Sequence, residues 1–295
     1  MVSGSNRHVR LDRLGKVDNV PKTTSVMTMK IDEARALSSV IRALGTDQFG
    51  AAIDVLLGEK VSFDLSCGYL FQFNQSAILI HNGYGQSVTE KTLSAYLRGG
   101  YLLDPFYVAC VNSHPAGLWR MTDLAPDSFF SSGFSISKDI HPCVSSEHGT
   151  AIEEVGFIIP IRPQVAIVYS VMRYLRNGQF TQAEMQELTV MGPIITALFE
   201  QHCQLSYSSS LKEEQPTDAM LEDAFVEILQ GRLTGTQRYI AKLLLQGHSN
   251  ASIAKLLKIS DGTVKVHKHN IYQRLEISTN AELFRLFIDY LAKAT

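Results

Sequence analysis

The spacing of apolar residues changes along the chain, and the changes predict the order of its secondary structure. Between residues 31 and 57, apolar residues recur every three or four positions on both sides of Gly45, which predicts two helices. From Cys67 to Phe73, every second position holds a cysteine or an aromatic residue, and residues 77–84 follow a short polar turn. These two segments therefore predict an antiparallel pair of strands.

The middle of the chain mixes one short helix with further extended segments. Residues 89–97 predict a helix, and residues 106–111 predict a strand. Residues 112–150 are rich in Ser, Gly, Pro and Asp, which is typical of loops with short helices. Two apolar runs at 155–161 and 165–173, separated by three turn residues, predict a β-hairpin.

A long helix follows this hairpin and ends at the one clear linker. Thr181 and Glu184 have the spacing of a capping box, in which the threonine oxygen and the carboxylate accept from each other's backbone N–H groups. The helix that they open runs toward Tyr207. Residues 206–217 are polar and rich in serine, which predicts a linker, and residues 218–230 predict one more amphipathic helix.

The last sixty residues predict four helices in close succession. Thr234 opens the first with a capping box to Gln237, and Gly247 ends it. Ser249 caps a short second helix, Ser260 caps a longer third one, and a fourth closes the chain. Two short helices, a tight turn and a longer helix in such a unit predict a helix-turn-helix arrangement.

Composition describes an ordinary globular chain, and charge separates its two parts. Of the 295 residues, 45% are apolar and 19% are charged, which excludes wholesale disorder and collagen-like or coiled-coil-only chains. No apolar stretch approaches the ~20 residues of a membrane span, and the N-terminus has no apolar leader core. The four cysteines are scattered, so we expect a cytoplasmic protein with reduced thiols.

The C-terminal part is basic, whereas the rest of the chain is acidic. Residues 233–295 hold nine Lys or Arg against four Asp or Glu, a net charge of +5, and the remainder carries −7. This separation indicates that the C-terminal part meets a polyanion.

These patterns predict two domains. We expect a disordered tail at 1–25, an α+β sensory domain at 26–205, a linker at 206–217 and a helix-turn-helix domain at 218–295. The expected fold of the sensory domain is an antiparallel sheet flanked by helices, similar to PAS and GAF domains or to the autoinducer-binding fold. A receiver domain is disfavoured, because it needs alternating strands and helices in a parallel sheet.

The third helix of the C-terminal part carries the candidate DNA contacts. With Val264, Ile271 and Leu275 facing inward, the N-terminal half of its outer side can enter a major groove. There a lysine can reach guanine, and a valine can pack on a thymine methyl. His267 lies nearer the inward side, where a structural role competes with DNA contact. The candidate DNA-binding residues are Ser249, Asn250, Ser260, Thr263, Lys265, Val266, His267, Lys268, His269 and Arg274.

Spaced identities in this part resemble the LuxR-type helix-turn-helix of bacterial transcription factors. They are Leu233-Thr234, residues 247–250, Ile253-Ala254, Leu257, Ile259-Ser260, residues 263–267, Asn270-Ile271 and Arg274-Leu275. The resemblance implies DNA binding; without it, a small helical bundle that binds protein would remain the alternative. Two positions depart from the family pattern. Gln237 stands where Glu is usual, which puts a common salt bridge in doubt, and Asn280 stands where Arg is usual, which removes a phosphate contact.

Aromatic residues and one carboxylate predict a small-molecule pocket in the sensory domain. Tyr96, Tyr101, Asp104-Pro105 and Trp119 resemble the Tyr…Asp-Pro…Trp arrangement of acyl-homoserine-lactone receptors. The resemblance implies that Asp104 accepts a hydrogen bond from a ligand amide and that Trp119 donates one to a ligand carbonyl. The candidate ligand-binding residues are Tyr69, Phe71, Tyr96, Tyr101, Asp104 and Trp119.

Other interpretations of these residues stay open. Aromatic rings and a carboxylate also suit an amine cation, and the same rings can simply fill a core while Asp104-Pro105 starts a turn. The sequence has no nucleophile elbow, P-loop or HExxH motif, so we expect no enzyme, no catalytic residue and no cofactor. His141, Cys143 and His148 match no standard zinc spacing, so we expect no metal site.

The sequence therefore predicts a ligand-responsive bacterial transcription factor that binds double-stranded operator DNA as a homodimer. Pairing is expected because one short recognition helix reads too few base pairs for specificity. The helices at 181–205 and 282–292 are the candidate dimer seams. A small-molecule effector and RNA polymerase are candidate partners, and no membrane contact is expected. The alternative is a regulator whose N-terminal domain has a filled core and responds to a protein partner.

Overall fold

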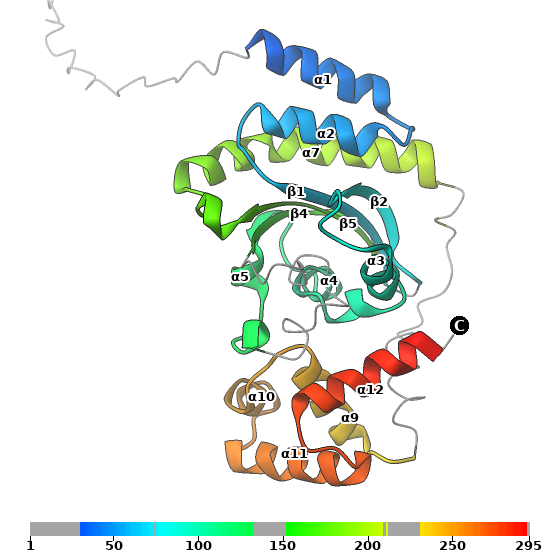
Figure 1. Cartoon of the computed structure of the whole chain (residues 1–295), viewed down its shortest axis with the longest axis vertical. Coiled ribbons are helices and arrows are strands. Elements are labelled where there is room, and N and C mark those ends of the chain that lie inside the picture. Colours follow the sequence, from blue (N-terminus) through cyan, green and yellow to red (C-terminus); the bar gives the residue numbers. More distant parts are fainter. Residues whose placement is uncertain (1–29, 74, 132–151, 209–210, 212–230, 294–295) are drawn as a thin grey trace, which may run out of the picture.

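The computed structural model describes two units that are packed against each other (Figure 1). The sheet unit comes first along the chain, and the helical unit, residues 231–293, follows it. The described residues are 30–73, 75–131, 152–208, 211 and 231–293. The predictions that fall outside them are the tail at 1–25, most of the linker, the helix at 218–230, and the interpretation of His141, Cys143 and His148.

The sheet unit is built on five antiparallel strands in the order β2-β1-β5-β4-β3. Their bounds are β1 (Leu65–Gln72), β2 (Ile78–Gly83), β3 (Gly117–Arg120), β4 (Ile152–Arg162) and β5 (Val165–Tyr174). β1 and most of β4 and β5 are buried on both faces, so each face must be covered by other elements. The predicted strand pair and the predicted hairpin are confirmed.

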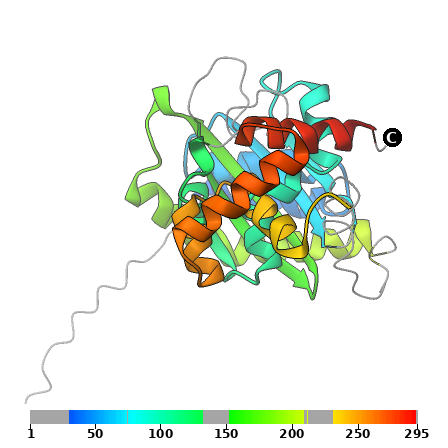
Figure 2. The same cartoon turned by 90° about the horizontal axis from the view of Figure 1, so that it is seen from below.

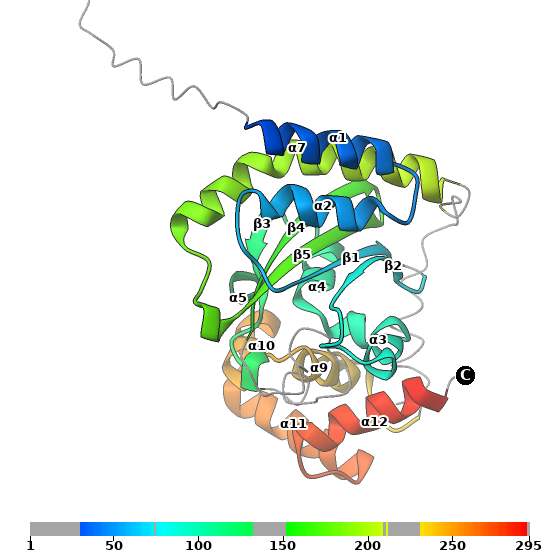
Figure 3. The ribbon, with the colours of Figure 1, turned by 45° about the horizontal axis from the view of Figure 1, so that its top comes forward.

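Three helices cover one face of the sheet (Figures 1 and 3). They are α1 (Ile31–Ala43), α2 (Phe49–Gly58) and α7 (Gln182–Tyr207). Ile53 of α2 and Phe199 of α7 pack there with Phe157 and Tyr169 of the sheet. Although α7 has 26 residues, neither it nor any other helix of the described chain is apolar enough over its length to cross a membrane.

Shorter helices cover the other face and lead to the helical unit. They are α3 (Glu90–Leu97), α4 (Pro105–Val111), α5 (Met121–Leu124) and the 3₁₀ turns Gly100–Leu103, Phe129–Ser131 and Leu175–Asn177. The helical unit holds α9 (Gly235–Leu245), α10 (Asn250–Leu257), α11 (Asp261–Leu275) and α12 (Asn280–Lys293). One continuous apolar core runs from this sheet face into the helical unit. The four predicted helices of the C-terminal part are confirmed.

The prediction of a strand at 106–111 is wrong, because this segment forms α4. The Asp104 carboxylate accepts a hydrogen bond from the Phe106 N–H at 2.8 Å and caps the helix. Pro105 occupies the first helical position, where its missing N–H costs nothing. The apolar run alone predicts an extended segment, because six residues are too few to show a helical period. The loop region also contains the unpredicted strand β3, which pairs with β4.

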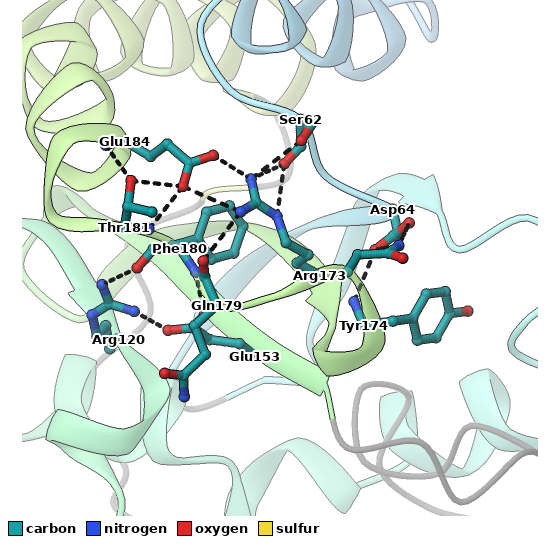
Figure 4. Close-up of polar contacts among 11 residues, drawn as sticks. Ser62, Asp64, Arg120, Glu153, Arg173, Tyr174, Gln179, Phe180, Thr181 and Glu184 are labelled. Carbon is teal, nitrogen blue, oxygen red and sulfur yellow. Dashed lines mark hydrogen bonds and ion pairs between the residues drawn. The ribbon is translucent and has the colours of Figure 1, made fainter.

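A network of ion pairs fixes the start of α7 to the sheet (Figure 4). Thr181 and Glu184 form the predicted capping box, and Arg173 of β5 donates to Glu184 Oε1 at 2.7 Å. Arg173 lowers the pKa of Glu184 to about 2, so this carboxylate is ionised at neutral pH. Arg120 of β3 pairs with Glu153 of β4. The helix that leads out of the sheet unit is therefore held at its N-terminus by the Arg173 side chain of β5.

The opposite end of α7 holds the turn between α1 and α2. His202 of α7 is buried, stacks on the Phe49 ring with centroids 4.0 Å apart, and accepts a hydrogen bond from the Gly45 N–H through Nδ1 at 3.2 Å. Gly45 has a φ of +79°, which glycine adopts without strain. Burial lowers the pKa of His202 to about 4.

The buried imidazole of His202 is expected to make the protein sensitive to acid. Because the folded-state pKa lies below the ordinary 6.5, the unfolded chain takes up a proton first as the pH falls. Stability is therefore fully present above pH 6.5 and falls toward pH 4, by at most about 3 kcal/mol from this group. His202→Phe keeps the stacking but removes the group that titrates. The difference in the free energy of unfolding between wild type and variant should therefore become smaller as the pH falls. Urea unfolding at several pH values measures this; parallel pH curves for the two proteins would contradict it.

Candidate functional site

Helix α11 presents its polar side at the end of the molecule opposite α1. Val264, Ile271 and Leu275 are buried inside the helical unit, as the sequence predicts. The outward positions of its N-terminal half are exposed, namely Thr263, Lys265, Val266 and His269. Val266 is 59% exposed, so its methyl groups are open to contact from outside. Figure 2 shows α11 crossing the face nearest the viewer.

A tight turn sets the angle between α10 and α11. Lys258 ends α10 in the left-handed conformation with φ +55°, and Ser260 caps α11 by accepting from the Thr263 N–H at 3.0 Å. Lys265 Nζ lies 2.7 Å from Asp261 Oδ2 along the exposed first turns of α11. Because both side chains are well exposed, this ion pair contributes little stability, and Lys265 can turn toward a phosphate or a base.

The two departures from the family pattern have structural substitutes. Gln237 Oε1 accepts from the Thr234 N–H at 3.0 Å, which confirms the capping box, and from Arg274 Nη1 at 3.1 Å. A charge-assisted hydrogen bond from the Arg274 guanidinium to a neutral amide oxygen thus takes the place of a salt bridge. Asn280 Oδ1 accepts from the Tyr272 hydroxyl. Arg274 is consequently tied to α9, so a DNA contact by this residue competes with an internal one.

The remaining polar residues of α11 lie closer to its inner side. The buried Nδ1 atom of His267 finds no hydrogen-bond partner among the described residues. Lys268 is half-buried, its ammonium lies 5.5 Å from the Tyr272 ring centroid, and desolvation lowers its pKa. Exposure therefore separates the predicted residues between 263 and 269 into four outward residues and a partly covered pair.

The N-terminus of α10 faces the sheet unit. Ser249 caps the helix by accepting from the Ser252 N–H at 3.1 Å, and Asn250 follows it as the first helical residue. Both residues line a cleft of about 230 Å³ between the two units. Ser249 is also bonded to Asp127 of the sheet unit, at 2.9 Å from its backbone N–H.

A small cavity lies on the sheet face that is covered by α3 and α4. Four predicted ligand-binding residues line it, Tyr69, Phe71, Tyr96 and Asp104. The Tyr96 hydroxyl donates to Asp104 Oδ2 at 2.7 Å, and the Tyr69 and Tyr84 hydroxyls lie 3.0 Å apart. These pairs fill most of the space, because the cavity volume is about 10 Å³, which is room for one water molecule.

Two predicted residues are placed outside this lining. Tyr101 packs on Phe71 with centroids 5.9 Å apart and donates to the Gln75 carbonyl at 3.1 Å. Trp119 is half-buried on β3, and its Nε1 donates to the Pro115 carbonyl at 2.9 Å. The indole N–H that the family resemblance assigns to a ligand therefore has a partner in the protein.

Sequence reasoning missed the residues that complete the cavity. They are Cys67, Tyr84, Glu154, Val168 and Ser170. The sequence indicates the cavity wall formed by Val168 and Ser170 only in part, because one polar residue inside an apolar strand is a weak sign of a binding site. Ser170 is fully buried, and its hydroxyl finds no hydrogen-bond partner in the described parts of the chain. A buried hydroxyl without a partner costs stability, so its retention suggests a use beyond the fold.

Comparison with known sequences identifies the helical unit and much of the remaining chain. A model of the bacterial regulatory proteins of the luxR family matches residues 232–287. The chain is 30% identical over 196 residues to an Aeromonas salmonicida protein described as an HTH-type transcriptional regulator in the exeN 3′ region. This match covers 65% of the chain and 96% of the relative.

Comparison with solved structures supports the sheet unit's fold. The VqsR LBD domain from Pseudomonas aeruginosa aligns with 59% of this chain and 97% of its own at a TM-score of 0.50 and 18% identity. Escherichia coli SdiA aligns with 88% of this chain and 97% of its own at 14% identity. Its TM-score of 0.37 is too low to support the fold assignment. The predicted fold class, an antiparallel sheet flanked by helices and followed by a helix-turn-helix unit, is confirmed.

Two buried serines on opposite faces of the sheet are expected to respond differently to alanine. Ser170→Ala removes a hydroxyl without a partner, so the free energy of unfolding should stay unchanged or rise by about 1 kcal/mol. Ser66→Ala, the matched control on β1, removes a hydroxyl bonded to Asp54 at 2.8 Å and should cost about 1–2 kcal/mol. Urea unfolding of the free protein measures both. An equal loss in the two variants would mean that the Ser170 hydroxyl has a structural partner.

Proposed function

The chain belongs to the LuxR family of bacterial transcriptional regulators, and from this premise we propose that it is a cytoplasmic, effector-controlled factor that binds operator DNA as a homodimer. We assign the DNA-binding domain to 218–295, the sensory domain to 26–205 and the linker to 206–217. The observation that carries the proposal is the exposed N-terminal half of α11, which offers a lysine, a valine and a histidine side by side.

We propose that α11 enters the major groove of DNA and that the N-terminal caps of α10 and α11 contact the DNA phosphate backbone. Lys265 offers a cation to guanine or phosphate, and Val266 offers an apolar contact to a thymine methyl. Ser249 and Ser260 stand at helix N-termini, where backbone N–H groups favour phosphate oxygens. His267, Lys268 and Arg274 are secondary in this proposal, because the first two are half-buried and Arg274 is bonded to Gln237.

We propose that two copies of the chain dimerise through α1, α2 and α7. These helices expose five large apolar side chains, Ile31, Ile41, Val55, Val190 and Leu205. The other predicted seam, α12, packs against α9 and reaches α3, so less of it is available to a second copy. We therefore favour α7 and its neighbours. Two paired recognition helices would read two half-sites and supply the specificity that one helix lacks.

The proposed effector site is the cavity under α3 and α4. Its apolar wall carries the Asp104 carboxylate, the Ser170 hydroxyl and tyrosine hydroxyls, a combination suited to a small molecule with an apolar body and a hydrogen-bonding head. The Asp104 carboxylate suits a ligand N–H, as in acyl-homoserine-lactone receptors. Because ligand pockets measure roughly 300 Å³ or more, binding requires the tyrosine side chains to move apart. RNA polymerase remains a proposed partner of the bound regulator.

Control would work as a population shift between two arrangements of the units. The cavity shares one continuous apolar core with the helical unit, so enlarging it alters the surface on which that unit rests. Arg173 and Glu184 hold the start of α7 to the sheet, so a change in the sheet also reaches the helix that leads toward the linker.

A second candidate function is favoured by the volume of the cavity. With room for a single water, the sheet unit is filled in this arrangement. The protein would then be a LuxR-type regulator that responds to a protein partner and not to a small molecule. The two candidates share the DNA-binding role and differ in what the sheet unit recognises.

Lys265→Ala is expected to weaken operator binding without unfolding the protein. The contact is worth about 1–3 kcal/mol, which is a five- to hundredfold loss in affinity. Fluorescence anisotropy with a duplex selected from a random pool by the wild-type protein measures it. Arg285→Ala, which removes the same charge from an exposed position on α12, is the control and should bind nearly as wild type. Equal affinity of Lys265→Ala and wild type would refute the assigned face.

The effector proposal predicts a bound small molecule after purification from the native host. Native mass spectrometry should detect it, and a saturating ligand at 100 times its dissociation constant should raise stability by ~2.7 kcal/mol. Tyr96→Phe, which removes a cavity hydroxyl, should reduce this gain. Tyr107→Phe, whose hydroxyl points to the Phe73 carbonyl outside the cavity lining, should retain it. Absence of any bound mass, with no stabilisation by a panel of acyl-homoserine lactones, would favour the protein-partner function.

A further inference from the structure

A carboxylate of the sheet unit binds the N-terminus of α10. Asp127 Oδ1 accepts from the Ser249 N–H at 2.9 Å, and Oδ2 accepts from the Ser249 hydroxyl. These bonds hold the pKa of Asp127 below its usual value, so it carries a full negative charge at neutral pH. One anionic group thus accepts from both donors of the cap residue.

The segment around Asp127 is shaped to lie against the helical unit. The Ser128 N–H donates to the Gly247 carbonyl at 3.0 Å. A Cβ at Gly247 would lie 2.5 Å from the Phe129 Cα, so only glycine permits this approach. Gly247 also has a φ of +91°, which favours glycine for a second reason. Phe129 itself is fully buried.

In helix-turn-helix proteins the helix before the recognition helix crosses the DNA backbone. Helix N-termini and serine hydroxyls are common donors to phosphate oxygens. The Ser249 N–H and hydroxyl form such a donor pair, and here they already hold an anion.

We propose that Asp127 acts as an intramolecular phosphate substitute, which occupies the α10 cap in the free protein and must leave when the DNA backbone binds there. The proposal rests on the proposed DNA-binding role of the helical unit and adds a regulatory contact to it. The recognition helix stays exposed, so the contact lowers the affinity for DNA without blocking the reading face. Because DNA and Asp127 compete for the same donors, any event that moves the 126–131 segment changes DNA affinity by linkage.

The interface is suited to opening. Beside the Asp127 contact lies the cleft of about 230 Å³, lined by Ser128 and Ser131 of the sheet unit and by Lys268 and Asn280 of the helical unit. This part of the boundary is polar and incompletely packed, as in transient interfaces, whereas the two units share an apolar core beside it. Lys268 on the cleft wall supplies a cation near the position that the backbone phosphate would take.

The test compares two single-charge variants of the full-length protein. Asp127→Asn removes the anion from the α10 cap, and Asp123→Asn removes an equal charge from an exposed position on α5 four residues away. Both are titrated with a labelled mixed-sequence duplex of about 30 base pairs, long enough for two half-sites one helical turn apart. Asp127→Asn should bind about tenfold more tightly than Asp123→Asn, because a charge-assisted hydrogen bond no longer opposes the phosphate. Asp127→Ala, which also removes the acceptor, should bind at least as tightly as Asp127→Asn.

Hydrogen exchange in the free protein provides a second measurement that does not depend on DNA. Amides of residues 248–252 should exchange faster in Asp127→Asn than in Asp123→Asn. Equal duplex affinities in the two variants would overturn the proposal, as would equal exchange rates. Loss of duplex binding in wild type and in all variants, with normal folding, would overturn the DNA-binding role itself. A third outcome separates the two roles. If wild type binds the duplex, Lys265→Ala weakens this binding, and the Asp127 and Asp123 variants bind with equal affinity, only the role of Asp127 is overturned.

Discussion

Burial of both faces of the central strands is the constraint on which the rest of the molecule depends. β1, β4 and β5 are too apolar to leave either face in water, so α1, α2 and α7 must cover one side and α3 and α4 the other. The second side is covered by short elements only. The helical unit completes it, and this joins the DNA-reading part to the wall of the cavity through one apolar core.

Periodicity and capping chemistry predicted most elements, because both are local properties of the chain. The capping boxes at Thr181 and Thr234 and the inward face of α11 could be read directly from the sequence. What could not be read depends on partners distant in the chain. The β3 strand exists because β4 offers it an edge, and the segment 106–111 becomes a helix because Asp104 caps it.

The same distinction applies to the candidate sites. Most of the candidate DNA-binding residues lie on α11, so their spacing predicts which of them face outward. The cavity collects residues from β1, β4, β5, α3, α4 and the residue that follows β2, and the sequence predicts only part of this lining, such as Tyr69, Phe71, Tyr96 and Asp104. Asp127 gave no signal at all, since an aspartate in a loop rich in Ser and Pro is ordinary until its position opposite α10 is known.

The placement of α11 at one end of the molecule gives the separation of charge along the chain a kinetic meaning. The last 63 residues carry +5 and the rest carries −7, so the part of the chain that contains α11 has the opposite charge to the remainder. In the electric field of a polyanion, such a protein is oriented before contact. Encounters then begin with the correct end leading, and productive collisions rise in frequency without any added contact, an advantage that dissolved salt diminishes.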